Sequence, residues 1–215
     1  MGMMLTLFQL LNKVCIRILK SKHFGLRYFL GIEFARNKEG ILLHQRKYAL
    51  ELIPDVGLAG SKPVHAPVEL NQKLTTVTYD DHLGLNDDSL LEDPGAYQRL
   101  IGILLYLTIT RPDIFFTVQS LSQFMQAPKY SHMKATLRVV RYIKQSPDLG
   151  ILMSVAESTQ LKAYCDADWV ACPNTRKSVT SYLVQFDNSL ILWKSKKQST
   201  ISREAEYRSL ASTVA

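Results

Sequence analysis

The chain has 215 residues, of which 47% are hydrophobic and 21% are charged, and its formal net charge is +7. These proportions are typical of a globular protein and exclude a wholly disordered, collagen-like or mucin-like chain. Three cysteines are too few for a disulfide framework. The longest apolar run, Leu100 to Thr110, is far shorter than the roughly 20 residues that span a bilayer, so we expect no membrane span.

The first segment is basic, because no acidic residue occurs before Glu33. Residues 5–22 place apolar side chains at helical spacing and are predicted to form a basic helix of the folded domain. A myristoylation signal beginning at Gly2 and a mitochondrial transit peptide are the alternatives. The sequence therefore does not fix a compartment: its low cysteine content favours a reducing, intracellular one, and cytoplasm, nucleus and mitochondrion all stay open.

A β-hairpin and a short helix follow. Leu26 to Arg36 is rich in aromatic and branched residues and is predicted to form a strand, Asn37 to Gly40 a turn, and Ile41 to His44 the returning strand. Gln45 to Ile53 has a helical pattern. We expect this helix to end before Pro54, because proline lacks a backbone donor and clashes with the preceding turn.

Residues 55–95 contain eight of the 19 acidic residues and many of the glycines and prolines. This composition predicts a long loop or linker with little core of its own. Two pairs of neighbouring acids, Asp80-Asp81 and Asp87-Asp88, lie within it. We interpret both pairs as solvated loop charge.

Helices and then strands are predicted in the second half. Three helices are expected over residues 96–110, 113–126 and 132–145, separated by Arg-Pro and Ala-Pro breaks. From residue 150 the pattern changes to strands. The strands are expected over residues 161–166, 179–186 and 190–193, and a helix begins at residue 204.

Charge alternates along the chain. Residues 1–53 have nine Lys or Arg and three Glu, a net +6, whereas residues 54–96 have two Lys and eight acids, a net −6. Residues 97–150 have seven bases and two Asp, a net +5, and residues 151–215 have eight bases and six acids, a net +2. Basic blocks suit a polyanion such as nucleic acid, although solvated lysine-rich faces are the simpler interpretation.

Seven short motifs occur along the chain in a fixed order. They are Tyr28 to Glu33 (YFLGIE), Gln45 to Tyr48 (QRKY), Tyr97 to Gly102 (YQRLIG), Thr110 to Ile114 (TRPDI), Cys165 to Trp169 (CDADW), Trp193 to Gln198 (WKSKKQ) and Glu204 to Arg208 (EAEYR). From about residue 26 to its end, the chain resembles copia-type LTR retrotransposon Pol polyproteins. It is also similar to isolated plant reading frames of this type, including mitochondrial ones.

The resemblance implies the region from late reverse transcriptase into RNase H, with an α/β mixed (α+β) fold. A helical thumb/connection-like region with a β-hairpin would precede a truncated RNase H-like fold of antiparallel strands and then a helix. The implied domains are a post-palm reverse-transcriptase segment (1–55), an acidic loop or linker (56–95), a helical thumb/connection-like region (96–150) and a truncated RNase H-like domain (151–215).

The parent activities implied by the resemblance are RNA-directed DNA synthesis and cleavage of RNA in RNA–DNA hybrids. The polymerase Tyr-x-Asp-Asp turn is absent from this sequence. RNase H chemistry uses two Mg²⁺ ions held by carboxylates. The resemblance places the catalytic acids at Asp166 and Glu206, and Asp168 is a further metal ligand if the strand continues that far, because residues i and i+2 face the same side.

In the family, two more aspartates follow further along, beyond Ala215. We therefore expect Mg²⁺ binding by this chain to be weak or absent, and whether it is an enzyme stays open. The expected function is nucleic-acid binding with little or no catalysis, with an RNA–DNA hybrid or primer–template as partner and the rest of the Pol polyprotein as context. Phosphate contacts are expected from basic residues of the RNase H-like region, namely Arg176, Lys177, Lys194, Lys196 and Lys197.

Two alternatives to this function are kept. The first is an active Mg²⁺-dependent RNase H-type endonuclease as part of a longer product. The second is a decayed reading frame that has no function.

Overall fold

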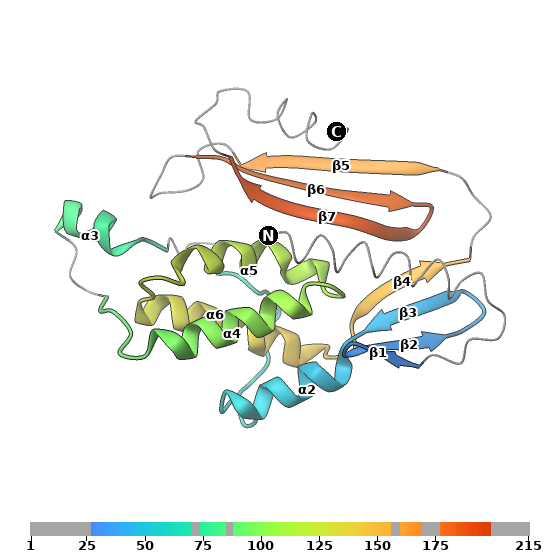
Figure 1. The fold of residues 1–215 in the computed structure, drawn as a ribbon, viewed down its shortest axis with the longest axis horizontal. Helices are drawn as coiled ribbons and strands as arrows, with labels where there is room; N and C mark the ends of the chain where they lie inside the picture. Colours follow the sequence, from blue (N-terminus) through green and yellow to red (C-terminus); the bar gives the residue numbers. More distant parts are fainter. Residues whose placement is uncertain (1–26, 70–73, 85–87, 156–159, 169–176, 199–215) are drawn as a thin grey trace.

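A computed structural model of the chain describes residues 27–69, 74–84, 88–155, 160–168 and 177–198. The model confirms the α+β class, since helices are combined with two antiparallel sheets (Figure 1). The helices predicted at residues 5–22 and from residue 204 lie outside the described residues. Within the described part of the chain, no helix is both long and apolar enough to cross a membrane.

The first sheet has the strand order β1-β2-β3-β4 and is antiparallel throughout. Its strands are β1 (Tyr28–Phe29), β2 (Ile32–Arg36), β3 (Gly40–His44) and β4 (Gly150–Ser154). The predicted hairpin is confirmed, but the single strand expected from Leu26 to Arg36 is wrong. Leu30 and Gly31 both have positive φ (47° and 73°) and turn the chain between β1 and β2, and the Tyr106 hydroxyl donates to the Leu30 carbonyl.

The β3–β4 pairing joins two parts of the chain that are far apart in the sequence. Gly40 pairs with Ser154 at one end of the ladder, and Gly150 pairs with His44 at the other. A Cβ atom on Gly40 would lie 2.0 Å from the Met153 carbonyl oxygen, and one on Gly150 would lie 2.1 Å from the Leu43 carbonyl oxygen. Both ends of the ladder therefore need glycine.

Helices form the central layer. They are α2 (Arg46–Asp55), α3 (Val77–Leu83), α4 (Pro94–Leu107), α5 (Phe115–Leu121) and α6 (Tyr130–Gln145), with short 3-10 turns η1 (Pro112–Ile114) and η2 (Ser122–Phe124) on either side of α5. The apolar faces of α2, α4, α5 and α6 meet in one core that includes Leu52, Ile101, Leu104, Val118 and Val139.

Two helix predictions are corrected. The helix predicted over residues 113–126 is instead η1, α5 and η2 in succession. Helix α2 includes Pro54 in its last turn rather than ending before it. Proline there removes one hydrogen bond, to the Leu50 carbonyl, and Leu50 lies on the exposed side of α2, where water can replace that bond.

The segment predicted to be a loop with little core wraps around α6. Lys144 Nζ donates to the carbonyls of Leu58, Ala59 and Ser61 at 3.1, 2.6 and 2.8 Å. Arg141 Nε donates to the Lys62 carbonyl at 2.8 Å. Backbone carbonyls of the loop thus hold the cationic side chains of one helix.

A buried ion network attaches the acidic segment to the start of α6. Lys129, which is 2% exposed, forms an ion pair with Asp80 and lies 3.3 Å from Asp88 Oδ2. The prediction that Asp80 is solvated charge is wrong, because a buried lysine needs an anionic partner. Burial raises the pKa of Asp80 and Asp88, but their bonds to Lys129 and Ser131 and the nearby Lys129 charge outweigh burial, and both pKa values lie below the usual value.

His132 completes this network. Its Nδ1 accepts from the Lys129 backbone N–H at 3.0 Å, its Nε2 lies 3.1 Å from the Thr75 carbonyl, and its ring stacks on Phe124 at 3.9 Å. Burial, together with the Lys129 charge, lowers the pKa of His132 to about 4. The imidazole is therefore neutral in the folded protein near neutral pH.

Arg111 joins the ends of α4 and α6. Its guanidinium is 2% exposed, donates to both oxygens of Asp113 (2.9 and 2.7 Å) and to the Ser146 carbonyl (2.9 Å), and lies over the Tyr142 ring at 5.6 Å. Next to it, Thr110 Oγ1 donates to Gln45 Oε1 at 2.8 Å. The Thr110 to Ile114 motif is thus a structural joint, and it fixes where η1 and α5 begin.

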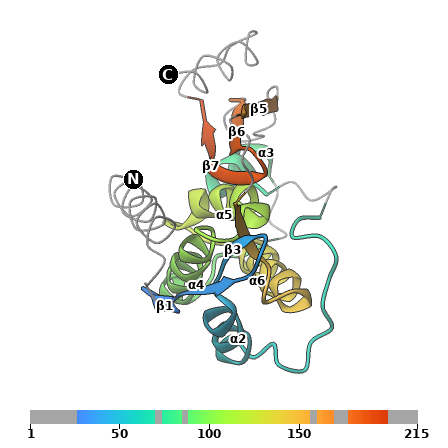
Figure 2. The ribbon, with the colours of Figure 1, turned by 90° about the vertical axis from the view of Figure 1, so that its right-hand side faces the viewer.

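The second sheet, in the order β5-β6-β7, is antiparallel and lies over the helical layer. Its strands are β5 (Leu161–Asp168), β6 (Val179–Phe186) and β7 (Ser189–Lys197). The strand predicted over residues 161–166 extends two residues further, to Asp168, and the strand predicted over residues 190–193 begins at Ser189 and extends to Lys197. Figures 1 and 2 agree that α5 lies between this sheet and the helices α2, α4 and α6. The Trp193 indole N–H, which donates to the Thr108 carbonyl at 3.2 Å, links β7 to the end of α4.

The low pKa of His132 predicts acid sensitivity. Unfolding returns this pKa to about 6.5, so between pH 6.5 and pH 4 the unfolded chain binds a proton that the folded chain does not. The free energy of unfolding should fall by up to about 3 kcal/mol as the pH drops through this window. Denaturant unfolding at several pH values measures this loss.

His132→Gln is the matched variant, because glutamine keeps an acceptor for the Lys129 N–H and a donor for Thr75. Its free energy of unfolding should vary less between pH 6.5 and 4. Asp80 and Asp88 have lowered pKa values, and most of their contribution is lost below pH 4; because both carboxylates are present in the variant as well, the difference between the two proteins reports His132. An equal loss in the variant would contradict the assignment.

Candidate nucleic-acid interface

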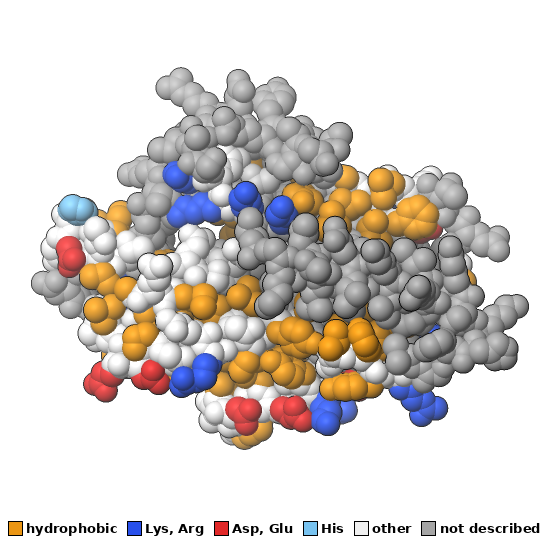
Figure 3. All heavy atoms as spheres, in the orientation of Figure 1, with side chains coloured by type: hydrophobic (Ala, Val, Ile, Leu, Met, Phe, Trp, Pro, Cys, Tyr) orange, Lys and Arg blue, Asp and Glu red, His pale blue; other side chains and the backbone are white. Residues whose placement is uncertain are grey.

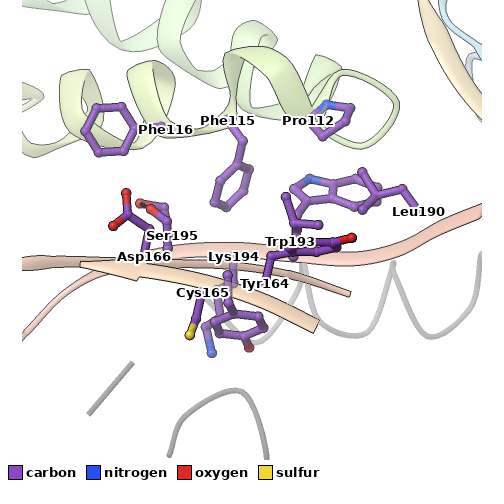
Figure 4. A pocket seen from close by; sticks show the side chains of 13 residues that line it. Pro112, Phe115, Phe116, Tyr164, Cys165, Asp166, Leu190, Trp193, Lys194 and Ser195 are labelled. Atoms are coloured by element: carbon purple, nitrogen blue, oxygen red, sulfur yellow. Dashed lines mark hydrogen bonds between the residues drawn. The ribbon is translucent and has the colours of Figure 1, made fainter. Parts of the chain in front are cut away.

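A cleft of about 220 Å³ separates α5 from the β5–β7 sheet. Pro112, Phe115 and Phe116 line it from η1 and α5 (Figure 4). The sheet contributes mainly aromatic and aliphatic side chains, namely Tyr164, Leu183, Leu190 and Trp193. The cleft also contains the one described residue that the sequence assigned to catalysis, Asp166.

Asp166 lies on β5 opposite Ser181, which in turn lies opposite Ser195 on β7. The Asp166 side chain is exposed, and its Oδ1 accepts from the Ala167 N–H at 2.8 Å. Figure 4 shows Asp166 and Ser195 pointing from the sheet toward α5. The hydroxyls of Ser181 and Ser195 lie 3.1 Å apart. Asp166 is therefore at one end of the cleft, beside two hydroxyl groups.

The other two predicted acids cannot be compared with it in position, because their side chains are outside the described part of the chain. Asp168 was expected to be a metal ligand only if the strand continued that far, and β5 does continue to Asp168. The Asp168 side chain and Glu206, however, lie outside the described part of the chain. Among the described residues, no three His, Cys, Asp or Glu side chains gather as a metal site would need. Mg²⁺ prefers several oxygen ligands in an octahedral arrangement. The one described carboxylate of the cleft supplies too few of these oxygen ligands.

The predicted basic residues lie together at one end of the sheet. Pairing of Val179 with Lys197 and of Thr180 with Lys196 brings the start of β6 to the end of β7, and Lys177 lies just before β6. Figure 3 shows Lys and Arg side chains gathered over this end of the sheet. Arg176 lies outside the described residues. None of the described lysines 177, 194, 196 and 197 is ion-paired with a described carboxylate.

These lysines are divided between the two faces of the sheet. Lys197 Nζ donates to Gln123 Oε1 at 3.1 Å and so faces the helices. Lys194 points away from the helices, on the face opposite Asp166 (Figure 4). Lys196, two residues further along, shares this outer face because side chains alternate along a strand, and it is exposed. Lys194 and Lys196 therefore form a basic outer face, whereas Asp166 belongs to the inner cleft.

The aromatic wall of the cleft was not anticipated from the sequence. Phe115 and Phe116 follow directly after the Thr110 to Ile114 motif, and a pair of adjacent aromatic residues after a helix break was the available signal. The structure shows that Trp193 packs through its contact with Thr108 and also lies in the cleft.

Comparison with known proteins gives relatives along almost the whole chain. The chain is 38% identical over 206 residues to the Retrovirus-related Pol polyprotein from transposon RE2 of Arabidopsis thaliana, and equally to that from transposon RE1. Each match covers 94% of this chain but only 14% and 13% of the two polyproteins. An uncharacterized mitochondrial protein of Arabidopsis thaliana is 33% identical over 214 residues, which cover 97% of this chain and 82% of that protein.

The chain is thus a retrotransposon-derived protein that spans about one-seventh of the Pol polyproteins it matches. It belongs to the copia-type retrotransposon Pol family. No family model matches the chain. No solved structure matches it either.

The single described carboxylate of the cleft predicts weak affinity for Mg²⁺. Isothermal titration calorimetry of the full chain with MgCl₂ should give no saturable binding below about millimolar concentration, because one carboxylate replaces few of the water ligands that Mg²⁺ keeps. The matched variant is Asp166→Asn, which keeps the shape of the side chain. Saturable micromolar binding that this variant abolishes would show that further acids converge on Asp166.

Proposed function

We propose that the chain is the late reverse-transcriptase and early RNase H region of a copia-type Pol polyprotein, and that it binds nucleic acid with little or no catalysis of its own. The single observation that carries the proposal is the basic outer face of the β5–β7 sheet, formed by Lys194 and Lys196 and continued by Lys177 at the same end. The partner would be an RNA–DNA hybrid or primer–template.

The spacing of these lysines supports contacts to a phosphate backbone. Residues two apart on one strand face are separated by about 6.6 Å, close to the separation of successive phosphates along a strand. None of the lysines is neutralised by a described carboxylate, so their charge is available to a polyanion. Such contacts hold a nucleic acid without reading its sequence.

The division between the two faces supports binding without cleavage. A backbone held against Lys194 and Lys196 lies on the outer face, whereas Asp166 points toward α5 on the inner face (Figure 4). Cleavage needs the carboxylates within contact distance of the scissile phosphate. A strand bound to the outer face would have to pass around the end of the sheet to reach Asp166.

Binding through lysines must weaken as salt rises, because each phosphate contact releases counterions. With Lys177, Lys194 and Lys196 engaged, the slope of log affinity against log salt should be about −2 to −3, measured by fluorescence anisotropy with a labelled RNA–DNA hybrid between about 50 and 200 mM salt. The double substitution Lys194→Gln and Lys196→Gln should reduce the steepness of that slope by about 2.

Lys38→Gln is the matched control for this experiment, because Lys38 is an exposed lysine on the distant β2–β3 turn. It removes the same charge and should leave the slope close to that of the original chain. An affinity that does not change with salt, or equal effects of the control and the double variant, would refute the proposed interface.

An RNase H-type endonuclease remains the second candidate, because β5 extends to Asp168 and so contains both acids of the Cys165 to Trp169 motif. A Mg²⁺-dependent cleavage assay on an RNA–DNA hybrid decides between the two functions. Activity that both Asp166→Asn and Glu206→Gln abolish would establish the enzyme. Activity that survives both substitutions would come from a contaminant or from other residues.

A further inference from the structure

The cleft under α5 has aromatic rings on both of its walls. Phe115 and Phe116 extend from α5, while Trp193 and Tyr164 lie on the sheet side (Figure 4). Phe116 is 40% exposed and Tyr164 is 52% exposed, so these rings are not packed as core residues. Accessible aromatic residues around a hollow mark a binding site more often than a packing defect.

The size of the cleft restricts what it can hold. Its volume is about 220 Å³. Pockets for drug-sized ligands measure about 300–1,000 Å³. One planar ring system therefore fits between the walls, whereas a sugar and phosphate attached to it would stay outside.

The polar groups of the cleft determine which hydrogen-bonding groups the ring system must present on its edge. Asp166 is the only charged side chain that Figure 4 shows pointing toward α5, because Lys194 points to the other face. An ionised carboxylate only accepts hydrogen bonds and can accept two in parallel. The ligand should therefore present two adjacent donors on one edge, beside the Ser195 hydroxyl.

Guanine alone among the four RNA bases meets this requirement. Its N1–H and its amino group are adjacent donors on one edge. Adenine and cytosine place a donor beside an acceptor, and uracil places a single donor between two acceptors. Stacking on aromatic side chains stabilises any base, so the discrimination must come from the carboxylate.

We propose that the cleft between α5 and the β5–β7 sheet binds one unpaired guanine base, which stacks against the aromatic walls and donates two hydrogen bonds to Asp166. This inference rests on the proposed nucleic-acid binding, since the base would belong to an unpaired part of the bound strand that passes around the end of the sheet from Lys194 and Lys196 into the cleft. It adds a position for a single unstacked base to an interface that otherwise contacts phosphates.

The test uses the full chain and free nucleosides. The chain contains two tryptophans, and Trp169→Phe leaves Trp193 as the only reporter. Guanosine should quench Trp193 fluorescence and bind at least about tenfold more tightly than adenosine, cytidine or uridine, the discrimination expected of a good bidentate pair. Calorimetry in parallel detects binding that leaves the fluorescence unchanged.

Three variants locate the site. Asp166→Ala and Asp166→Asn should both reduce guanosine affinity to that of the other nucleosides, and using two substitutions guards against a folding defect in one. Phe116→Ala should weaken binding at least about fivefold, as expected from the loss of one stacking contact. Phe186→Ala is the matched control, because Phe186 is an exposed phenylalanine of the same sheet that does not line the cleft.

Equal binding of all four nucleosides, binding that ignores Asp166, or no binding by either method overturns the proposal. These failures are separate from a failure of the lysine interface, because guanosine has no phosphate and its affinity should not respond to Lys194→Gln or Lys196→Gln. A hybrid that binds with the expected salt dependence while guanosine does not bind would leave the proposed function intact and remove the base site.

Discussion

The burial of Arg111 determines how the end of α4 is held against the end of α6. A cation that is 2% exposed must be paired, and Asp113, the Ser146 carbonyl and the Tyr142 ring together provide its partners. These contacts hold the end of α4 beside the end of α6 and set the start of η1. Phe115 and Phe116 follow directly after η1, so the contacts of Arg111 also fix the position of the α5 wall of the cleft.

Local patterns were sufficient for α2, α4 and α6, apart from their ends, and for the hairpin of β2 and β3, because periodicity and turn residues act over a few positions. They failed where the decisive partner is distant. Asp80 looked like solvent-exposed charge until Lys129, 49 residues away, was placed beside it. In the same way, a cluster of lysines was predictable from the Trp193 to Gln198 motif, but its division between two faces required the register of β6 and β7.

The family motifs have unequal physical roles in this chain. Gln45 and Thr110 bond to each other, and Tyr97 is fully buried with its hydroxyl donating to the Leu121 carbonyl, so these motif residues maintain the helical core. The motifs of the second sheet instead provide exposed groups, such as Asp166 and Lys196. The motifs of the helical part therefore have structural roles, whereas any binding or catalysis would depend on the motifs of the β5–β7 sheet.

The pairing of β3 with β4 also constrains how the chain is made. Gly40 on β3 pairs with Ser154 on β4, which is synthesised more than 100 residues later. During synthesis on the ribosome, β3 is therefore an open edge for as long as the helices are being translated, and an open edge can recruit the wrong strand. The early hairpin is consequently open to mispairing until β4 has been synthesised.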